Sequence, residues 1–138
     1  MKANELSSRD LMVGDWLIHA NGTQMQVKRI VLEHFACGEK YTNFWEYNNK
    51  FMPIPLTPEI LEKNGFERDK NISLYNAYTG INSRVILHDD FMSMNSRNMW
   101  NVHVDSEDYC TIANCELTYV HELQHLLKLC KINFEFNN

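Results

Sequence analysis

The sequence predicts an α+β protein in which a small, strongly curled β-sheet or barrel precedes a short helix, an antiparallel meander and a closing helix. Three observations lead to this prediction. Short stretches that alternate apolar and polar residues recur from residue 16 to residue 112, a proline-containing segment at 53–56 divides them, and the last apolar stretch has helical spacing. A helix closing over a strand meander gives an α+β architecture. We expect residues 1–56 and 57–138 to form two subdomains, or to share one core.

The first subdomain is predicted from a turn, a strand and a hairpin signal. Residues 10–15 favour a turn that leads into a strand at 16–19, and Asn21-Gly22 favours a tight hairpin because both residues tolerate positive φ. Residues 25–31 then alternate, and 44–47 and 51–54 could add two short strands. The opening Leu-x-Val-Gly-Asp-Trp-Leu at 11–17, followed by a tight hairpin, resembles SH3-like barrels, including the KOW type.

The second subdomain begins with a helix whose ends are both marked. Thr57 is a good N-cap, Pro58 suits the first helical position, and Asn64-Gly65 favours a left-handed stop. Strands are predicted at 72–78, 84–88, 99–104 and 109–112, with turns at 79–82 and 105–108. A final helix is predicted over 114–130, with an apolar core stripe formed by Val120, Leu123, Leu127 and Cys130.

Charge and composition exclude several classes of function. The net charge is −5, and all of it comes from residues 57–138, which carry seven basic and twelve acidic groups. Nucleic-acid binding usually depends on clustered Lys and Arg, which this chain lacks, so a nucleic-acid partner is not expected. The sequence has neither the apolar run of a signal peptide nor the length of a membrane span. We therefore expect a soluble cytoplasmic protein whose four cysteines are reduced thiols.

One segment of the final helix spells a catalytic signature. His121-Glu122-Leu123-Gln124-His125 matches H-E-x-x-H, in which two histidines one helical turn apart hold zinc and the glutamate acts as general base. On a helical wheel, however, His121 and His125 lie opposite Leu123 and its apolar stripe, which predicts that they face solvent. We therefore expect a structural helix with neither a catalytic residue nor a metal ligand. The alternative is a zinc hydrolase with Glu122 as base and His121 and His125 as ligands.

Zinc catalysis would also need a third protein ligand. Only 13 residues follow His125, lysines stand at 128 and 131 where longer zinc motifs carry Gly and His, and Glu135 is the single later carboxylate. Upstream candidates are His88, Asp89, Asp90, His103 and Asp105. A second alternative is a nucleic-acid accessory whose N-terminal aromatic residues stack on bases; these are Trp16, Phe44, Trp45 and Tyr47.

Two stretches carry a resemblance that covers most of the chain. They are Pro-Ile-Pro-Leu-Thr-Pro-Glu-Ile-Leu-Glu-Lys-Asn-Gly-Phe at 53–66 and Tyr-Val-His-Glu-Leu-Gln-His-Leu-Leu at 119–127. Together with the Gly-Asp-Trp strand region, they resemble a group of small uncharacterised proteins of Bacteroides-type gut bacteria and their prophages or mobile elements. In that group the closing motif is often His-x-Leu-Gln-Asn, without the glutamate or the second histidine. This implies that Glu122 and His125 are local variations in a helix whose role is structural. The group has no known activity, so the resemblance implies no mechanism. Our main expectation is a small cytoplasmic protein without catalysis that acts through protein contacts, as an accessory of a prophage or mobile element.

Overall fold

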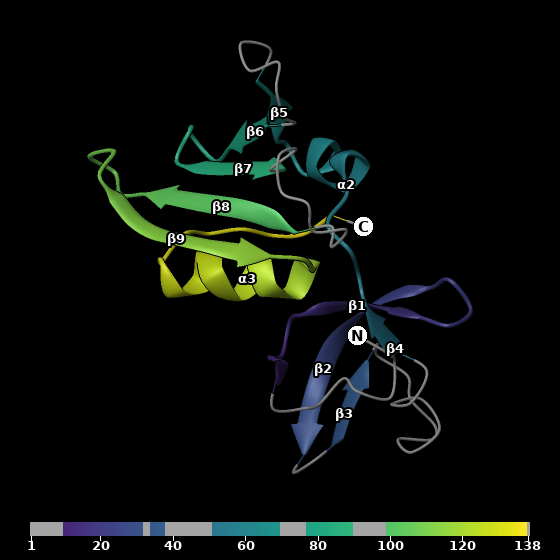
Figure 1. The fold of residues 1–138 in the computed structure, drawn as a ribbon. Helices are drawn as coiled ribbons and strands as arrows, with labels where there is room; N and C mark the ends of the chain where they lie inside the picture. Colours follow the sequence, from purple (N-terminus) through teal and green to yellow (C-terminus); the bar gives the residue numbers. More distant parts are fainter. Residues whose placement is uncertain (1–9, 32–33, 38–50, 70–76, 90–98, 138) are drawn as a thin grey trace. The chain divides into compact units, whose positions relative to one another are not determined.

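The computed structural model describes residues 10–31, 34–37, 51–69, 77–89 and 99–137 (Figure 1). Contacts divide the chain into two units. Unit 1 comprises Met1–Pro55 and Tyr119–His125, and unit 2 comprises Leu56–Thr118 and Leu126–Asn138. The closing helix, α3 (Val120–Leu129), therefore contributes its first half to unit 1 and its second half to unit 2. The predicted α+β class is confirmed, because two antiparallel sheets are combined with helices.

Unit 1 contains a four-stranded antiparallel sheet. Its strands are β1 (Trp16–His19), β2 (Gln24–Val31), β3 (His34–Cys37) and β4 (Phe51–Pro53), in the order β3-β2-β1-β4. The predicted hairpin joins β1 to β2, and Gly22 in its loop has a φ of 90°. Within the described residues the sheet has two ends and does not close into a barrel. Its core consists of Leu11, Leu17, Val27, Phe35, Cys37 and Phe51.

Unit 2 starts with the predicted short helix, α2 (Pro58–Lys63). Its N-terminus is capped as expected, because Thr57 Oγ1 accepts a hydrogen bond from Ile60 N at 3.2 Å. Gly65 follows with a φ of 86°, which matches the predicted left-handed stop. Phe66 is buried directly after it, and its amide donates to Leu61 O.

A five-stranded antiparallel sheet forms the body of unit 2 (Figure 1). Its strands run in chain order as β5 (Glu67–Arg68), β6 (Ala77–Gly80), β7 (Val85–Asp89), β8 (Trp100–Asp105) and β9 (Thr111–Leu117). The turn predicted at 79–82 begins later, because Thr79 and Gly80 belong to β6 and positive φ angles start at Ile81. The parts of predicted strands at 44–47 and 72–76 lie outside the described residues.

The predicted start of the last helix at residue 114 is wrong. Residues 114–117 belong to β9, and α3 begins at Val120. The reason is tertiary pairing: β9 is hydrogen-bonded along β8 from Asp105↔Thr111 to Trp100↔Leu117, and this ladder outweighs a modest local helix preference. Helices α2 and α3 have six and ten residues, and no helix of the described chain is long and apolar enough to cross a membrane.

Candidate functional site

The first turn of α3 is fixed to unit 1 by backbone hydrogen bonds. Val120 N donates to Ile54 O at 2.8 Å, and Pro55 forms a β-bridge with Tyr119. Glu122 Oε1 accepts a hydrogen bond from Tyr119 N at 3.0 Å. A glutamate three residues after the N-cap that reaches back to the N-cap amide is half of a capping box, and its charge also favours the positive end of the helix dipole. Glu122 is therefore the cap of its own helix.

Gln124 joins the same helix to the chain entering β1. Its amide nitrogen Nε2 donates to Gly14 O, and its oxygen Oε1 accepts from Trp16 N, each at 3.0 Å. One side-chain amide thus supplies a donor and an acceptor to backbone groups two residues apart, as a neighbouring strand would. The close approach of the Gln124 side chain to this backbone depends on the turn before β1. In that turn Asp15 N donates to Met12 O, and Gly14 has a φ of 101°.

His125 is paired with Asp15, which lies in that same turn. His125 Nε2 and Asp15 Oδ2 are 2.6 Å apart, and the two side chains are 26% and 3% exposed. Asp15 Oδ2 also accepts a hydrogen bond from Met12 N at 2.8 Å. A buried carboxylate is costly unless donors surround it. Asp15 Oδ2 meets that requirement, because it contacts both Met12 N in the turn and His125 Nε2 on the helix.

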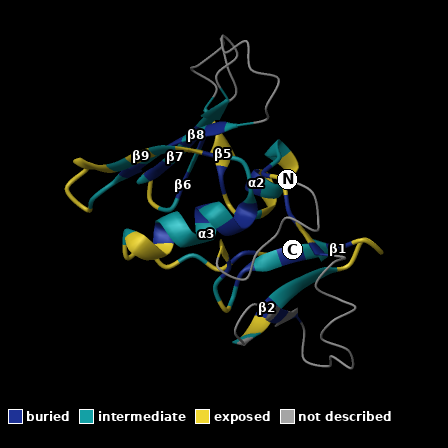
Figure 2. Cartoon of the chain, turned by 60° about the horizontal axis from the view of Figure 1, so that its bottom comes forward, coloured by how far each residue is buried: buried dark blue, intermediate teal, exposed yellow. Residues whose placement is uncertain are grey.

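The prediction that both histidines face solvent is wrong for His121 and only partly right for His125. His121 is 4% exposed, although it lies off the leucine stripe as the wheel indicates. Helix α3 is buried or half-buried over most of its length and exposed only at its end (Figure 2). The reason is that this face of the helix is covered in turn by residues 10–15 of unit 1. The Tyr119 ring also stacks on the His121 ring, with 6.0 Å between centroids and 14° between planes. The helix thus buries two faces, and a wheel identifies only the more apolar one.

Burial lowers the pKa of His121 below its ordinary value of 6.5. Desolvation of the charged imidazolium is the largest cause; the electrostatic effect of His125 acts in the same direction, whereas Asp15, Glu122 and Asp10 oppose it. The Nδ1 atom of His121 is buried and has no hydrogen-bond partner. His121 is therefore a neutral buried ring at neutral pH.

This lowered pKa predicts that acid destabilises the protein through His121. Below pH 6.5 the unfolded chain takes up a proton on this residue before the folded chain does, so the free energy of unfolding should fall as pH is lowered. The measurement is urea unfolding from about pH 7.5 to pH 5.5, in the presence of a chelator. His121→Gln should flatten the slope in this range, whereas an unchanged slope would show that other groups cause it.

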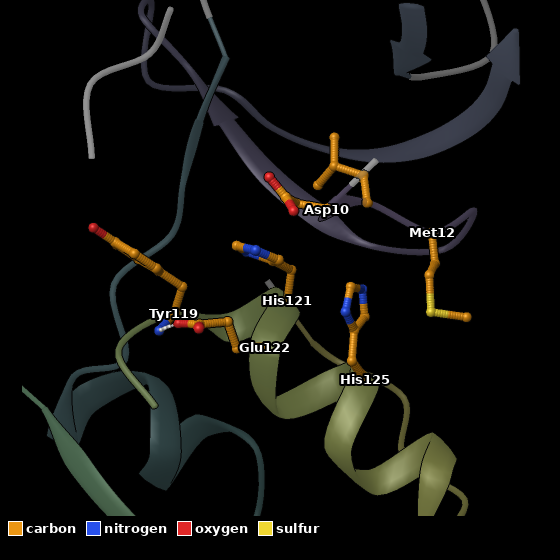
Figure 3. Close-up of a pocket in the computed structure, with 7 residues that line it drawn as sticks. Asp10, Met12, Tyr119, His121, Glu122 and His125 are labelled. Carbon is orange, nitrogen blue, oxygen red and sulfur yellow. Dashed lines mark hydrogen bonds between the residues drawn. The ribbon is translucent and has the colours of Figure 1, made fainter. Parts of the chain in front are cut away.

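A cavity of about 550 Å³ lies where these groups meet in unit 1. Its lining consists of Asp10, Leu11, Met12, Tyr119, His121, Glu122 and His125 (Figure 3). Both imidazoles rise from α3 toward the segment that carries Asp10 and Met12, whereas the Glu122 carboxylate turns toward the Tyr119 amide. Across the described residues, no three His, Cys, Asp or Glu side chains form a group that could hold a metal ion.

The other candidate ligands do not line this cavity. His88 and Asp89 lie in β7, and His103 and Asp105 lie in β8, all within the sheet of unit 2. His103 Nε2 is 2.9 Å from Thr111 Oγ1, a partner on the adjacent strand. Asp90 and three residues of the proposed stacking platform, Phe44, Trp45 and Tyr47, lie outside the described residues.

The residues that sequence reasoning missed are those that hold the helix in place. Asp15 and Gln124 meet their partners across about 110 positions of chain, so no local spacing indicates the contacts. The only signal is the compact turn sequence Met-Val-Gly-Asp at 12–15, which marks a fixed backbone but not its partner. Comparison with known proteins adds no further guide, because no family model, curated protein or solved structure matches the chain.

Proposed function

We propose that this α+β protein acts without catalysis, as a cytoplasmic accessory protein of a prophage or mobile element that works by binding another protein. The observation that carries the proposal is the position of Glu122. In a zinc hydrolase this carboxylate must polarise a metal-bound water. Here it accepts a hydrogen bond from Tyr119 N at 3.0 Å, and its oxygens turn away from His125 (Figure 3).

The pairing of His125 supports the same proposal. Its Nε2 atom, 2.6 Å from Asp15 Oδ2, is occupied by a structural contact. Gln124, which lies between the two histidines in sequence, is hydrogen-bonded to Gly14 O and Trp16 N. Four of the five letters of the motif, including Leu123 in the core, thus have a role in the fold. A motif whose members are used structurally needs no catalytic explanation.

Charge favours a protein over a nucleic acid as the partner. Residues 57–138 carry seven basic and twelve acidic groups, so this part of the chain repels phosphate at neutral pH. We expect no salt-dependent shift of single- or double-stranded DNA. A shift that weakens steeply with added salt would instead support the nucleic-acid alternative.

An SH3-like arrangement of unit 1 is part of the proposal. It is supported by the 11–17 turn-and-strand sequence, by the β1–β2 hairpin and by the antiparallel order β3-β2-β1-β4. Small β-sheet domains of this kind present binding surfaces in many unrelated proteins, so the fold alone names no partner.

The test separates capping from catalysis at Glu122. Glu122→Gln should retain nearly wild-type stability because the amide oxygen can still accept from Tyr119 N, whereas Glu122→Ala should lose about 0.5–1.5 kcal/mol in urea unfolding. Protein purified without an affinity tag should contain far less than one zinc per chain and should cleave no peptide or ester. Stoichiometric zinc that is lost in His121→Ala, together with hydrolysis abolished by Glu122→Gln, would establish the hydrolase instead.

A further inference from the structure

Two histidines and a methionine line the cavity of unit 1, together with the carboxylates of Asp10 and Glu122. His121 and His125 are one helical turn apart on α3, their ring centroids are 5.6 Å apart, and both line the cavity together with Met12 (Figure 3). His121 is 96% buried, yet its Nδ1 atom has no hydrogen-bond partner. Buried ring nitrogens are normally satisfied. His121 thus carries one ring nitrogen that bonds to no other group of the described fold.

One buried carboxylate positions two of these three residues. Asp15 Oδ2 contacts His125 Nε2 at 2.6 Å and accepts from Met12 N at 2.8 Å. When neutral His125 donates its Nε2 proton to Asp15, its lone pair is on Nδ1, the other ring nitrogen. Carboxylates that hold a ligating imidazole in this way are typical of the outer shell of metal sites. Asp15 is therefore a positioning residue for the cavity as well as a link in the fold.

The kinds of ligand atom on His121, His125 and Met12 indicate which metal ion would bind. Two imidazoles and a thioether suit a soft ion, whereas magnesium, calcium and manganese need oxygen ligands. The usual zinc sets of three or four His, Cys, Asp or Glu ligands have no counterpart in the described part of the chain. Leu11 and the ring of Tyr119 supply apolar walls. We propose that this cavity binds one copper(I) ion through His121, His125 and Met12.

The binding test must first remove competing thiols. Cys110, Cys115 and Cys130 are replaced by serine, and Cys37 is kept because burial raises its pKa to about 12, so that it is no thiolate at neutral pH. Copper(I) is supplied as its acetonitrile complex without oxygen, with bicinchoninate as the competing chelator. We expect one copper(I) per chain to be retained against the chelator.

Substitutions in the cavity should weaken this binding selectively. Met12→Leu keeps the apolar volume but removes the sulfur, and should weaken copper(I) binding by at least about tenfold, as should His121→Ala. Met52→Leu, at an exposed methionine of β4, is the matched control and should bind normally. Equal retention of copper by the Met12→Leu or His121→Ala protein would overturn the proposal.

A second measurement needs no substitution in the cavity. Copper(I) is diamagnetic, so ¹⁵N spectra of the histidine side chains in the three-serine protein report which rings bind it. We expect the nitrogens of His121 and His125 to shift together at one equivalent, while those of His103, which is bonded to Thr111, stay in place. Shifts confined to other histidines, or no copper retained against bicinchoninate, would overturn the proposal. Either result would leave the non-catalytic function intact, because that depends on Glu122.

Discussion

Asp15→Ala is expected to lower the free energy of unfolding by about 2–3 kcal/mol. The substitution leaves Met12 N without its acceptor and His125 without its partner. The expected loss is less than for a fully buried pair, because the His125 side chain is 26% exposed and water can replace part of the lost contact. Urea unfolding at neutral pH, followed by tryptophan fluorescence, measures the difference.

Two matched variants test whether the effect is specific to this carboxylate. Asp15→Asn keeps an oxygen that can accept from Met12 N, so it should lose less stability than Asp15→Ala. Asp10→Asn removes a neighbouring carboxylate of an exposed residue and should change stability by less than about 0.5 kcal/mol. If all three variants unfold at the wild-type urea concentration, Asp15 does not fix the helix to the turn.

Gln124→Ala should be the next most damaging change, at about 2 kcal/mol, because it removes two hydrogen bonds to backbone. Gly14 O keeps a second donor in Gln26 Nε2, at 2.9 Å, which limits the loss on that side. Native-state amide exchange should show faster exchange at Trp16 N in the variant. Lys128→Ala, at an exposed position of the same helix, is the control and should leave both measurements unchanged.

Local sequence signals were sufficient for most elements of the fold. The hairpin after β1, the Thr57 cap and the stop at Gly65 each depend on residues close in sequence, and each is found as predicted. The start of α3 was misplaced because residues 114–117 can continue a helical pattern locally. Their pairing with β8 is a long-range contact that the pattern does not contain.

The candidate site was predicted less well, for a related reason. The wheel correctly put Val120, Leu123 and Leu127 in the core, and it correctly put His121 on a different face. It could not indicate that residues 10–15, more than a hundred positions earlier, cover that face. Two side-chain hydrogen bonds join the helix to Gly14 and Asp15 of the turn, and a third joins it to Trp16 at the start of β1. The sequence His-Glu-Leu-Gln-His does not indicate any of them.

The structural use of the motif also explains why its letters can match a catalytic signature. A glutamate early in a helix serves as a cap, and polar residues one turn apart can bond to a neighbouring turn of backbone. In this chain Glu122 and Gln124 meet these needs through Tyr119 N, Gly14 O and Trp16 N. The same five letters can therefore arise from the requirements of a helix that is buried on two faces.

A double-mutant cycle between Asp15 and His125 tests the structural role of the motif most directly. Asp15→Ala, His125→Ala and the double variant are unfolded in urea, and their losses are compared. We predict a coupling of about 1–2 kcal/mol, with the double variant little worse than Asp15→Ala alone. Losses that add to within about 0.3 kcal/mol would contradict this role, since two side chains 2.6 Å apart would then contribute independently.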